Sequence, residues 1–333
     1  TDTQHDDRFA MAQSVMDFSM RSVMCAPLMC EGRVLGFILM DARQISTSYD
    51  QEGLTLLAGI ANQAALTIAN ARLHQQLIKR ERLEQDLRNA HRIQTSFLPQ
   101  DPPRLLGYEF LDWYDAAQEV GGDFYDFISV PGGKILSVVG DVSGKGITAA
   151  LMMAKMTSNV RFFAAQEAGP GELLRKLNEM TMRNDTDMFI TCLIMLLDPE
   201  NNALTLANAG HCYPMMLKMD CSHERVQGES GFPIGITADA TYPEFGLELD
   251  EGDVLCAFTD GIIEAMNEQR EQFGYERLAD AMVEGCGTAQ STMSSIQRAI
   301  RAHTRTAAQS DDLTLVCMGR LSPEQTEMGK TAE

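Results

Sequence analysis

Residues 119–146, EVGGDFYDFISVPGGKILSVVGDVSGKG, are the stretch that decides the fold of this chain of 333 residues. Two runs rich in Val, Ile and aromatic residues lie on either side of the PGG sequence at 131–133. Such runs around a Pro/Gly turn predict an antiparallel hairpin, with strands at 123–130 and 134–142. The glycines of the following SGKG predict a sharp turn into a helix.

The predicted hairpin carries a carboxylate near each of its open ends. Asp123 begins the first strand, and Asp141 stands near the end of the second. Residues equidistant from a turn face each other, so a turn centred near Gly132 is expected to set Asp123 against Val142 and diagonal to Asp141. We therefore expect the two carboxylates to meet at one edge of a sheet.

Two further aspartates stand at strand ends later in the chain. Asp260 follows the apolar run DVLCAFT, and Asp311 stands directly before the run DLTLVCM. Antiparallel pairing of these runs would bring the two together, so that all four carboxylates could converge. A single Asp beside Gly is typical of a turn or a helix cap. Unpaired carboxylates this close raise one another's pKa, so a cluster of four makes sense only around cations.

The expected ligands are all oxygen atoms. Without His or Cys, such a set selects hard ions, and we predict Mn²⁺ or Mg²⁺ in place of zinc. Two such ions can bridge a hydroxide that attacks phosphorus while they stabilise the charge on the phosphoryl oxygens. The predicted chemistry is therefore hydrolysis of a phosphoryl group.

The rest of the C-terminal part predicts an α+β domain. Apolar strands come in pairs and helices are grouped between them, which is typical of a sandwich with sheets inside and helices outside. Further strands are expected at 107–115, 188–197, 202–209, 213–218, 244–249, 253–259 and 312–318, and helices at 146–166, 170–184, 261–266, 274–284 and 289–305.

The N-terminal part is predicted to be a separate unit. Residues 22–40 indicate two short strands around a polar EGR turn, and residues 51–77 carry apolar side chains at helical spacing. This order resembles the second half of a GAF sensor domain. The expected division is a GAF-like part at 1–70, a helical linker at 71–98, the α+β domain at 99–320 and a polar tail at 321–333.

The linker at 71–98 has two interpretations. Its apolar stripe, which includes Leu77, Leu83, Leu87 and Phe97, is interrupted near Arg80. A parallel coiled coil would bury that stripe in a homodimer, whereas a single amphipathic helix would lay it on its own domain. We favour the coiled coil and predict a homodimer through the linker. Prolines at 99, 102 and 103 end the helix.

Composition and charge exclude several classes of function. The net charge is −20, which repels phosphate backbones and anionic membranes, so we expect no nucleic acid and no membrane contact from this fragment. No basic N-terminal region precedes an apolar run, and no run reaches the roughly 18 apolar residues of a membrane span. A cytoplasmic location is predicted. The eight cysteines contain no CxxC pair and are expected to be buried thiols of a reducing compartment.

Seven motifs occur in the order seen in the PPM family of metal-dependent protein phosphatases. They are GGDFYDF, GDVSGKGITAALMMA, MFITCLIMLLD, NAGHCYPMML, GFPIGI, TDGIIEAMN and SDDLTLV. The chain from about residue 95 to 320 resembles the bacterial branch of that family, typified by the stage II sporulation phosphatase and the phosphatases that activate stress sigma factors.

The resemblance implies an α/β/β/α sandwich and a protein serine/threonine phosphatase with two Mn²⁺ or Mg²⁺ ions. It implies Asp123, Asp141 and the Val142 carbonyl as ligands in one part of the metal centre. Asp260 and Asp311 would form the other part, and Asp141 would bridge the ions.

Two features of the eukaryotic relatives are missing. Ser143 stands where they carry a histidine that is proposed as the general acid, and no upstream phosphate-binding arginine is found, as is usual in the bacterial branch. His211, in NAGH, is more typical of a hydrogen-bonded structural histidine. Asp312 is expected to orient the ligands or cap the strand, and Lys145 either reaches phosphate or lies in solvent.

The resemblance also implies a partner and a mode of control. The substrate in this branch is typically a STAS-type anti-anti-sigma protein phosphorylated on Ser or Thr, dephosphorylated here under control of the sensor domain. One alternative is a catalytically inactive PPM-fold binding module, although all the expected aspartates are present. Another is a diguanylate cyclase with a GGDEF signature, but Phe124 stands where a carboxylate is needed, and TDG and DDLT have no place there.

Overall fold

The computed structural model describes residues 22–42, 49–166, 169–183 and 187–322. The chain divides into two compact units, one up to Asp86 and one from Leu87 onward, and each is described by itself. Most of the predicted polar tail and the first part of the GAF-like segment lie outside the described residues.

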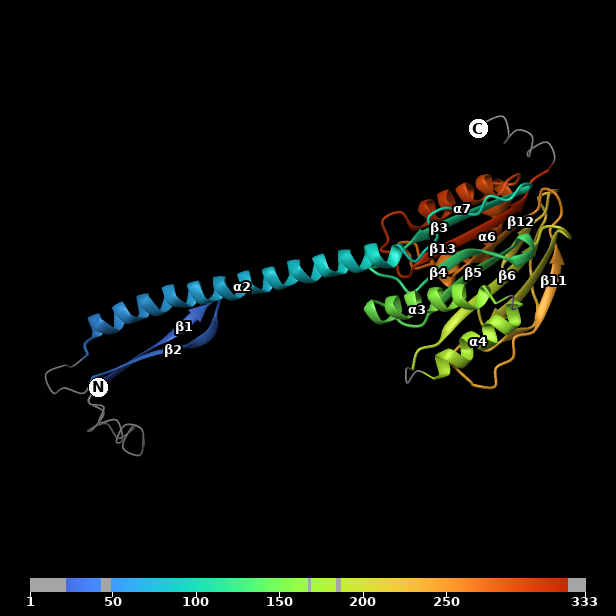
Figure 1. Cartoon of the computed structure of the whole chain (residues 1–333). Coiled ribbons are helices and arrows are strands. Elements are labelled where there is room, and N and C mark those ends of the chain that lie inside the picture. Colours follow the sequence, from blue (N-terminus) through green and yellow to red (C-terminus); the bar gives the residue numbers. More distant parts are fainter. Residues whose placement is uncertain (1–21, 43–48, 167–168, 184–186, 323–333) are drawn as a thin grey trace. The chain divides into compact units, whose positions relative to one another are not determined.

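The N-terminal unit contains the predicted hairpin, formed by β1 (Ser22–Cys30) and β2 (Arg33–Ala42), which pair antiparallel (Figure 1). Glu31 and Gly32 make the turn with φ of 47° and 75°, the left-handed conformation that a two-residue hairpin loop favours. The helix α2 (Gln51–Thr95) follows. Its N-terminal part and the hairpin share a small core of Ala26, Leu28, Leu57, Ala61 and Ala65.

Among the described residues, α2 is the one helix that is long and apolar enough to cross a membrane by length and composition, with an 18-residue window of mean hydropathy 1.3. The sequence was expected to contain no such stretch. This is weak evidence, because the helix of a soluble core passes the same test, and Leu57, Ala61 and Ala65 of α2 are already buried within its own unit. It does not show a membrane span.

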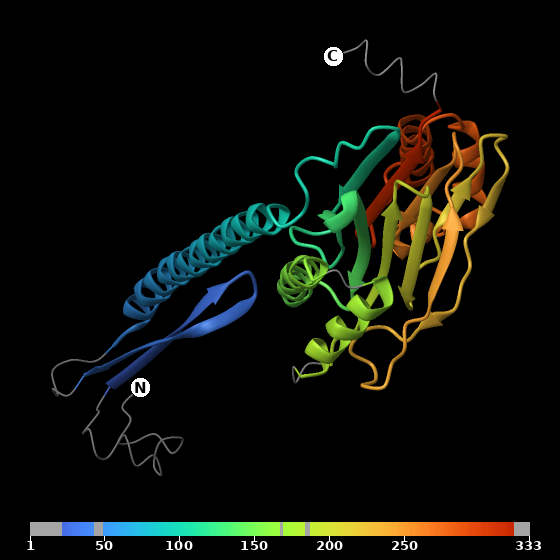
Figure 2. The same ribbon diagram turned by 45° about the vertical axis from the view of Figure 1, so that its right-hand side comes forward.

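The C-terminal unit is built on two sheets (Figure 2). The first has the order β10-β7-β6-β5-β4, with β11 also paired to β7. Its strands are β4 (Phe124–Val130), β5 (Lys134–Val142), β6 (Ile190–Asp198), β7 (Ala203–Ala209), β10 (Ser230–Gly231) and β11 (Glu244–Glu248). The second has the order β3-β13-β12-β8-β9, made of β3 (Tyr108–Asp115), β8 (Met215–Leu217), β9 (His223–Arg225), β12 (Val254–Phe258) and β13 (Leu313–Arg320).

Helices cover the outer face of each sheet (Figures 1 and 2). On the first sheet, α3 (Ile147–Ala164) contacts β4 and β5, and α4 (Pro170–Met182) contacts β6 and β7. On the second, α6 (Gly274–Glu284) contacts β8, and α7 (Ala289–Thr304) contacts β3, β12 and β13. The short α5 (Asp260–Glu264) follows β12. The predicted α+β class and α/β/β/α sandwich are confirmed.

The composition of the strands follows from this layering. Along β12, Leu255 and Ala257 belong to the core between the sheets, whereas Val254, Cys256 and Phe258 belong to the core beneath α6 and α7. Successive side chains of a strand point to opposite faces, and both faces of this sheet are covered. The strand is therefore apolar at every position and not at every second one.

The predicted strands and helices of this unit are present, and their ends differ from the predictions by at most two residues. Two strands were not predicted, namely β9 and β10, which have three and two residues. Segments this short do not show a period of two, so only their partners in the sheet define them.

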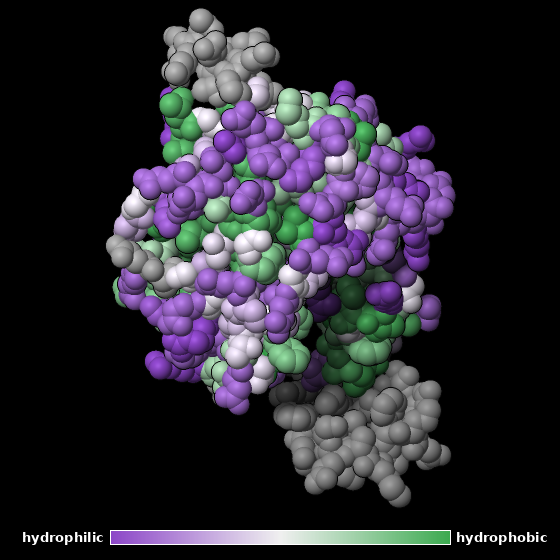
Figure 3. Space-filling model, turned by 90° about the vertical axis from the view of Figure 1, so that its right-hand side faces the viewer, coloured by the Kyte–Doolittle hydropathy of each residue, from purple (hydrophilic) through white to green (hydrophobic). Residues whose placement is uncertain are grey.

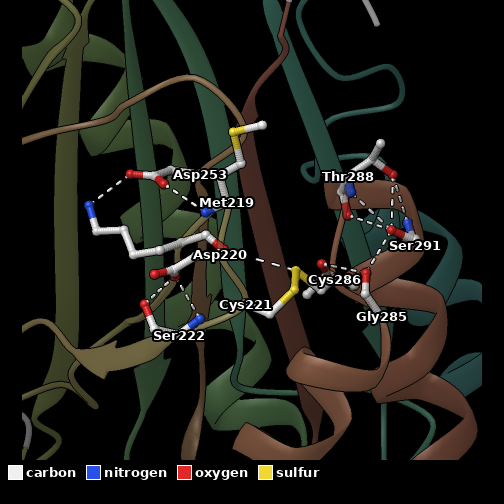
Figure 4. Close-up of a disulfide and its surroundings, with 11 residues drawn as sticks. Met219, Asp220, Cys221, Ser222, Asp253, Gly285, Cys286, Thr288 and Ser291 are labelled. Carbon is white, nitrogen blue, oxygen red and sulfur yellow. Dashed lines mark hydrogen bonds and ion pairs between the residues drawn. A yellow bond between two sulfur atoms is a disulfide. The ribbon is translucent and has the colours of Figure 1, made fainter.

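Two of the cysteines correct the expectation of buried free thiols. Cys221, in the turn after β8, and Cys286, in the loop between α6 and α7, form a disulfide with a Cα–Cα distance of 5.7 Å (Figure 4). They lie 65 residues apart in the sequence, so no short spacing such as CxxC indicates that these two cysteines pair. The bond ties the β8–β9 hairpin to the helical layer. Cys192, Cys256 and Cys317 are buried free thiols, as predicted, whereas Cys25 is exposed and Cys30 and Cys212 are half-buried, contrary to the prediction.

The face drawn in Figure 3 is covered largely by hydrophilic residues, with smaller hydrophobic areas between them. This distribution agrees with a net charge of −20 on a chain whose apolar side chains are mostly used in the cores. The charged residues form most of the solvated surface, whereas the carboxylates of Asp123, Asp126, Asp253 and Asp312 are buried.

Candidate metal centre

The register of the β4–β5 hairpin places Asp123 and Asp141 together. Val130 pairs with Lys134 and Phe124 pairs with Gly140, so one further step sets Asp123 opposite Asp141. The expected partner of Asp123, Val142, is therefore wrong by one residue. The turn at 131–133 is centred on residue 132, as predicted, with φ of 79° and 70° at its two glycines. Residues equidistant from this centre are 123 and 141, so the predicted pairing with Val142 was one residue out of register.

Asp123 is held between the two sheets. Its side chain is 2% exposed, and its Oδ2 accepts hydrogen bonds from the hydroxyls of Thr259 at 2.6 Å and Thr314 at 2.5 Å. Thr259 follows β12 and Thr314 lies on β13, both in the second sheet, whereas Asp123 begins β4 of the first. One carboxylate oxygen is thus fixed by the opposite sheet, which sets the direction of the other.

The two carboxyls of the hairpin strongly affect each other. Burial, and then the Asp260 carboxylate, raises the pKa of Asp141 to about 6. Burial, and then the charge of Asp141, raises the pKa of Asp123 well above its ordinary value. A hydrogen bond with Asp123 acts on Asp141 in the opposite direction. Without a positive charge between them, the pair can keep its mutual repulsion low only by holding a proton.

Gly122 allows the chain to pass close to these groups. A Cβ at this position would lie 2.9 Å from the Val142 carbonyl oxygen and 3.4 Å from Oδ1 of Asp141. The backbone of the loop before Asp123 therefore lies against the carbonyl that the sequence predicts as a ligand. A glycine is required because any side chain would enter this space.

The second pair of carboxylates comes from the neighbouring ends of β12 and β13. These strands pair antiparallel, as predicted, and Asp260 follows the end of β12 while Asp311 precedes β13. A Cβ on Gly261 would lie 1.9 Å from the Asp312 carbonyl oxygen and 3.4 Å from Cβ of Asp311, so the two segments are in close contact. Burial, and then the Asp311 carboxylate, raises the pKa of Asp260.

Asp312 is used in binding backbone groups. Its Oδ1 accepts a hydrogen bond from Ala117 N at 2.9 Å, and its Oδ2 accepts from Gly122 N at 2.7 Å and Asp123 N at 3.4 Å. These bonds hold the loop that leads into Asp123. Both oxygens of Asp312 therefore orient the centre through the backbone.

The Lys145 side chain reaches from the loop after Asp141 to the segment before β13. Its Nζ donates to Oδ2 of Asp311 at 2.8 Å and to the Ser310 carbonyl at 2.6 Å. The lysine therefore joins the loop after Asp141, in the first sheet, to the start of β13 in the second. Both side chains are partly exposed, so this ion pair contributes little to stability but restricts the position of Asp311.

Neither His211 nor Ser143 has the setting of a general acid. The Nδ1 of His211 lies 2.8 Å from the Thr191 hydroxyl, and burial lowers its pKa to about 4, so the ring is neutral at pH 7. Its backbone N–H donates to Asn208. The Ser143 hydroxyl accepts a hydrogen bond from Phe189 N at 2.9 Å. Both side chains hold neighbouring segments in place.

The four aspartates suit a hard divalent cation by their chemistry. Among the described residues, no three His, Cys, Asp or Glu side chains already stand in the geometry of a bound metal. The donors are nevertheless all oxygens, they form two adjacent pairs, and Asp141 interacts with both Asp123 and Asp260. A cation between them would relieve the repulsion that raises their pKa values.

Several contacts of the centre were not predicted from the sequence. Thr259 and Thr314, which bind Asp123, stand inside the quoted TDG and DDLT motifs, where a threonine within two residues of an aspartate was a usable signal. The contact of Gln94 with Gly121 had no such signal, because Gln94 lies on the linker helix, outside the motifs that contain the aspartates. It depends on how the end of α2 packs against the loop before Asp123.

Comparison with known proteins identifies the family to which this architecture belongs. The family model described as "Stage II sporulation protein E (SpoIIE)" matches residues 131–321, a range that contains Asp141, Asp260 and Asp311. The chain belongs to the SpoIIE family. A GAF domain model matches residues 1–68, in agreement with the predicted sensor segment.

Curated relatives of this SpoIIE-family chain include Protein IcfG of Synechocystis, which is 26% identical over 264 residues, covering 71% of this chain and 41% of IcfG. The phosphoserine phosphatase RsbU of Bacillus subtilis is 27% identical over 207 residues, covering 61% of each protein. The chain thus spans less than two thirds of the length of either relative.

Solved structures share the fold. The SiaA-PP2C domain of Pseudomonas aeruginosa matches with a TM-score of 0.63 and 21% identity, covering 73% of this chain and 99% of that domain. The RsbU and RsbW domains of Rv1364c from Mycobacterium tuberculosis match with a TM-score of 0.61 and 24% identity, covering 68% of this chain and 64% of that one. These similarities support the sandwich architecture.

Proposed function

We propose that this chain is a metal-dependent protein serine/threonine phosphatase. The observation that carries the proposal is the convergence of two aspartate pairs, one from each sheet, with Asp123 buried and the other three at least partly exposed. An all-oxygen cluster of this kind suits Mn²⁺ or Mg²⁺ and hydrolysis of a phosphoryl group. Two relatives that are named phosphoserine phosphatases, RsbU and RsbP, support the assignment of the reaction.

The proposed ligands divide between two ions. Asp123, Asp141 and the Val142 carbonyl would hold one, and Asp141, Asp260 and Asp311 would hold the other. When bound, two such ions supply an activated hydroxide and neutralise charge on the phosphoryl oxygens.

The remaining residues of the centre hold these ligands in place. Thr259 and Thr314 fix one oxygen of Asp123. Asp312 fixes the backbone before Asp123, and Lys145 fixes Asp311. The chain thus orients Asp123 and Asp311, one ligand of each pair, before any substrate is bound, and such prior orientation helps to position a nucleophile and a phosphoryl group for reaction.

The test is to replace Asp141 or Asp260 with Asn and to measure Mn²⁺-dependent release of phosphate from a phosphoserine peptide. Activity should fall below about a tenth of the unmodified protein, since each substitution removes an ionic ligand. Asp198→Asn is the matched control, because Asp198 is a partly exposed aspartate at the C-terminal end of β6 and pairs with Lys134. Equal activity of the Asp141 or Asp260 variant and the control in a metal-replete assay would refute the assignment.

We propose a phosphorylated STAS-type protein as the substrate, within the control of a sigma factor in the cytoplasm. The motif resemblance and the similarity to RsbU and RsbP support this choice. Candidate STAS proteins phosphorylated on Ser or Thr should lose one phosphate, about 80 Da by intact mass, on incubation with the chain and Mn²⁺. A STAS protein that keeps its phosphate while the peptides are hydrolysed would exclude this substrate class.

We further propose that the linker joins two chains and carries the state of the GAF-like part to the metal centre. Leu73, Leu77 and Leu83 of α2 are exposed within their unit and would be covered in a coiled-coil dimer. At the end of the same helix, His91 Nδ1 lies 2.7 Å from the Glu119 carbonyl, in the loop that leads to Asp123. Light scattering should show a dimer for the full chain and a monomer after deletion of residues 1–86.

A further inference from the structure

Arg225 is a cation at the edge of the second sheet. It lies on β9, opposite Met215 of β8, and its guanidinium carbon lies 3.6 Å from the centroid of the Tyr275 ring. Arg225 is exposed, and within the described part of the chain its side chain makes no ion pair. Stacking on an aromatic ring fixes the guanidinium plane and leaves its N–H groups directed sideways, available to an anion.

Tyr275 connects this arginine to the metal centre. Its ring packs edge-on against Phe258, the last residue of β12, at a centroid distance of 6.1 Å. Its hydroxyl lies close enough to the Cys212 thiol for the two groups to affect each other's pKa. Cys212 in turn lies close enough to Asp260 for that carboxylate, after burial, to raise the pKa of its thiol to about 11. Tyr275 and Cys212 therefore stand between Arg225 and Asp260.

This spacing decides what Arg225 can bind. A phosphoryl group at the four aspartates is separated from Arg225 by Tyr275 and Cys212. An anionic group that pairs with Arg225 therefore belongs to a neighbouring residue of the same substrate. The guanidinium fork matches the two oxygens of a carboxylate, so an acidic side chain is the fitting partner.

The charge of the surroundings favours the same conclusion. The chain carries a net charge of −20, and Glu264 adds a further carboxylate near Asp260 and Asp311. A phosphoprotein segment with acidic residues would be repelled by this environment unless a cation stood at the point of entry. Arg225 supplies that cation.

We propose that Arg225 is a specificity-determining residue that binds an acidic side chain of the phosphoprotein next to its phosphorylated Ser or Thr. This inference rests on the proposed phosphatase function. It defines the substrate by its chemistry: a phosphorylated residue with Asp or Glu close to it in the sequence or in the fold.

The experiment uses a panel of phosphoserine peptides in which one Glu is placed in turn at each of the positions within about three residues of the phosphoserine, the reach of a side-chain pair. Each has a partner peptide with Gln at the same position. For the unmodified protein, kcat/KM should be about fivefold to tenfold higher for the best Glu peptide than for its Gln partner, mainly through KM, as for one partly exposed ion pair. Arg225→Gln should bring this ratio close to one.

Three further variants separate binding from structure. Arg225→Lys keeps the charge without the planar fork and should retain part of the preference, whereas Tyr275→Leu removes the stacking surface and should lose most of it. Arg298→Gln removes the same charge from the outer helix α7 and should leave the ratio unchanged. If no Glu peptide is preferred, or if Arg225→Gln lowers turnover of Glu and Gln peptides equally, the proposal is wrong.

Binding gives a second readout that does not depend on turnover. Fluorescence anisotropy with labelled phosphopeptides should show the same Glu-over-Gln preference in the unmodified protein and its loss in Arg225→Gln. Absence of hydrolysis of every peptide, together with this binding preference, would refute the phosphatase function and leave Arg225 as a binding residue. Equal binding of Glu and Gln peptides by the unmodified protein refutes the role of Arg225.

Discussion

Gln94 provides the sharpest test of how the linker meets the metal centre. It lies near the end of α2 and is 5% exposed. Its Nε2 donates to the Gly121 carbonyl at 2.5 Å, and its Oε1 accepts from Gly121 N at 3.1 Å. Gly121 stands two residues before Asp123. Replacement of Gln94 with Leu keeps a side chain of similar size but leaves both backbone groups of Gly121 without that partner.

The magnitude follows from the two lost bonds. A buried backbone group that loses its hydrogen bond costs about 1–3 kcal/mol, so Gln94→Leu should lower the free energy of unfolding by about 2–4 kcal/mol after partial relaxation. The loop is closely packed at this point, because even a Cβ on Gly121 would overlap Oδ2 of Asp312 and the Tyr114 hydroxyl, and Gly121 is joined to Asp123 through Gly122 alone. Displacement of the loop should therefore move Asp123 and lower Mn²⁺-dependent turnover by at least about tenfold.

The assay has two parts, urea unfolding of the chelated protein and calorimetric titration with Mn²⁺. The matched control is Gln100→Leu, since Gln100 is exposed and its amide donates to the carbonyls of Thr95 and Leu98 at 3.2 Å. The control should lose less than about 1 kcal/mol. If Gln94→Leu matches the control in stability, Mn²⁺ affinity and turnover, the end of α2 does not hold the metal-binding loop.

Three other outcomes are expected. Because Asp141 has its pKa raised to about 6 in the fold, the chelated protein should lose about 3 kcal/mol of stability as the pH rises from about 4 to about 6, and Asp141→Asn should remove that part of the urea-measured pH dependence. Replacing both Cys221 and Cys286 with Ser should lower the free energy of unfolding by up to about 4 kcal/mol. In the unmodified protein, denatured without a reductant, thiol titration should find six thiols in place of eight. Gly122→Ala should weaken Mn²⁺ binding in calorimetry, since its Cβ would enter the space beside the Val142 carbonyl; unchanged affinity would contradict that packing.

Local patterns in the sequence determined most of the secondary structure and the composition of the centre. Hairpin strands around the turn at 131–133, helices at 3.6-residue spacing and aspartates beside glycines are all encoded within a few neighbouring residues. The pairing of β12 with β13 could also be predicted, because both runs are long and apolar and each has an aspartate at the end that meets the other.

Tertiary structure alone decided the contacts between distant segments. The hydrogen bonds of Asp123 with Thr259 and Thr314 span 136 and 191 residues, and those of Asp312 with Gly122 span 190. The disulfide, the stacking of Arg225 on Tyr275 and the bonds of Gln94 to Gly121 are of the same kind. Each depends on how sheets and helices pack around a shared core, and that packing is fixed by the summed burial of many side chains and by no local motif.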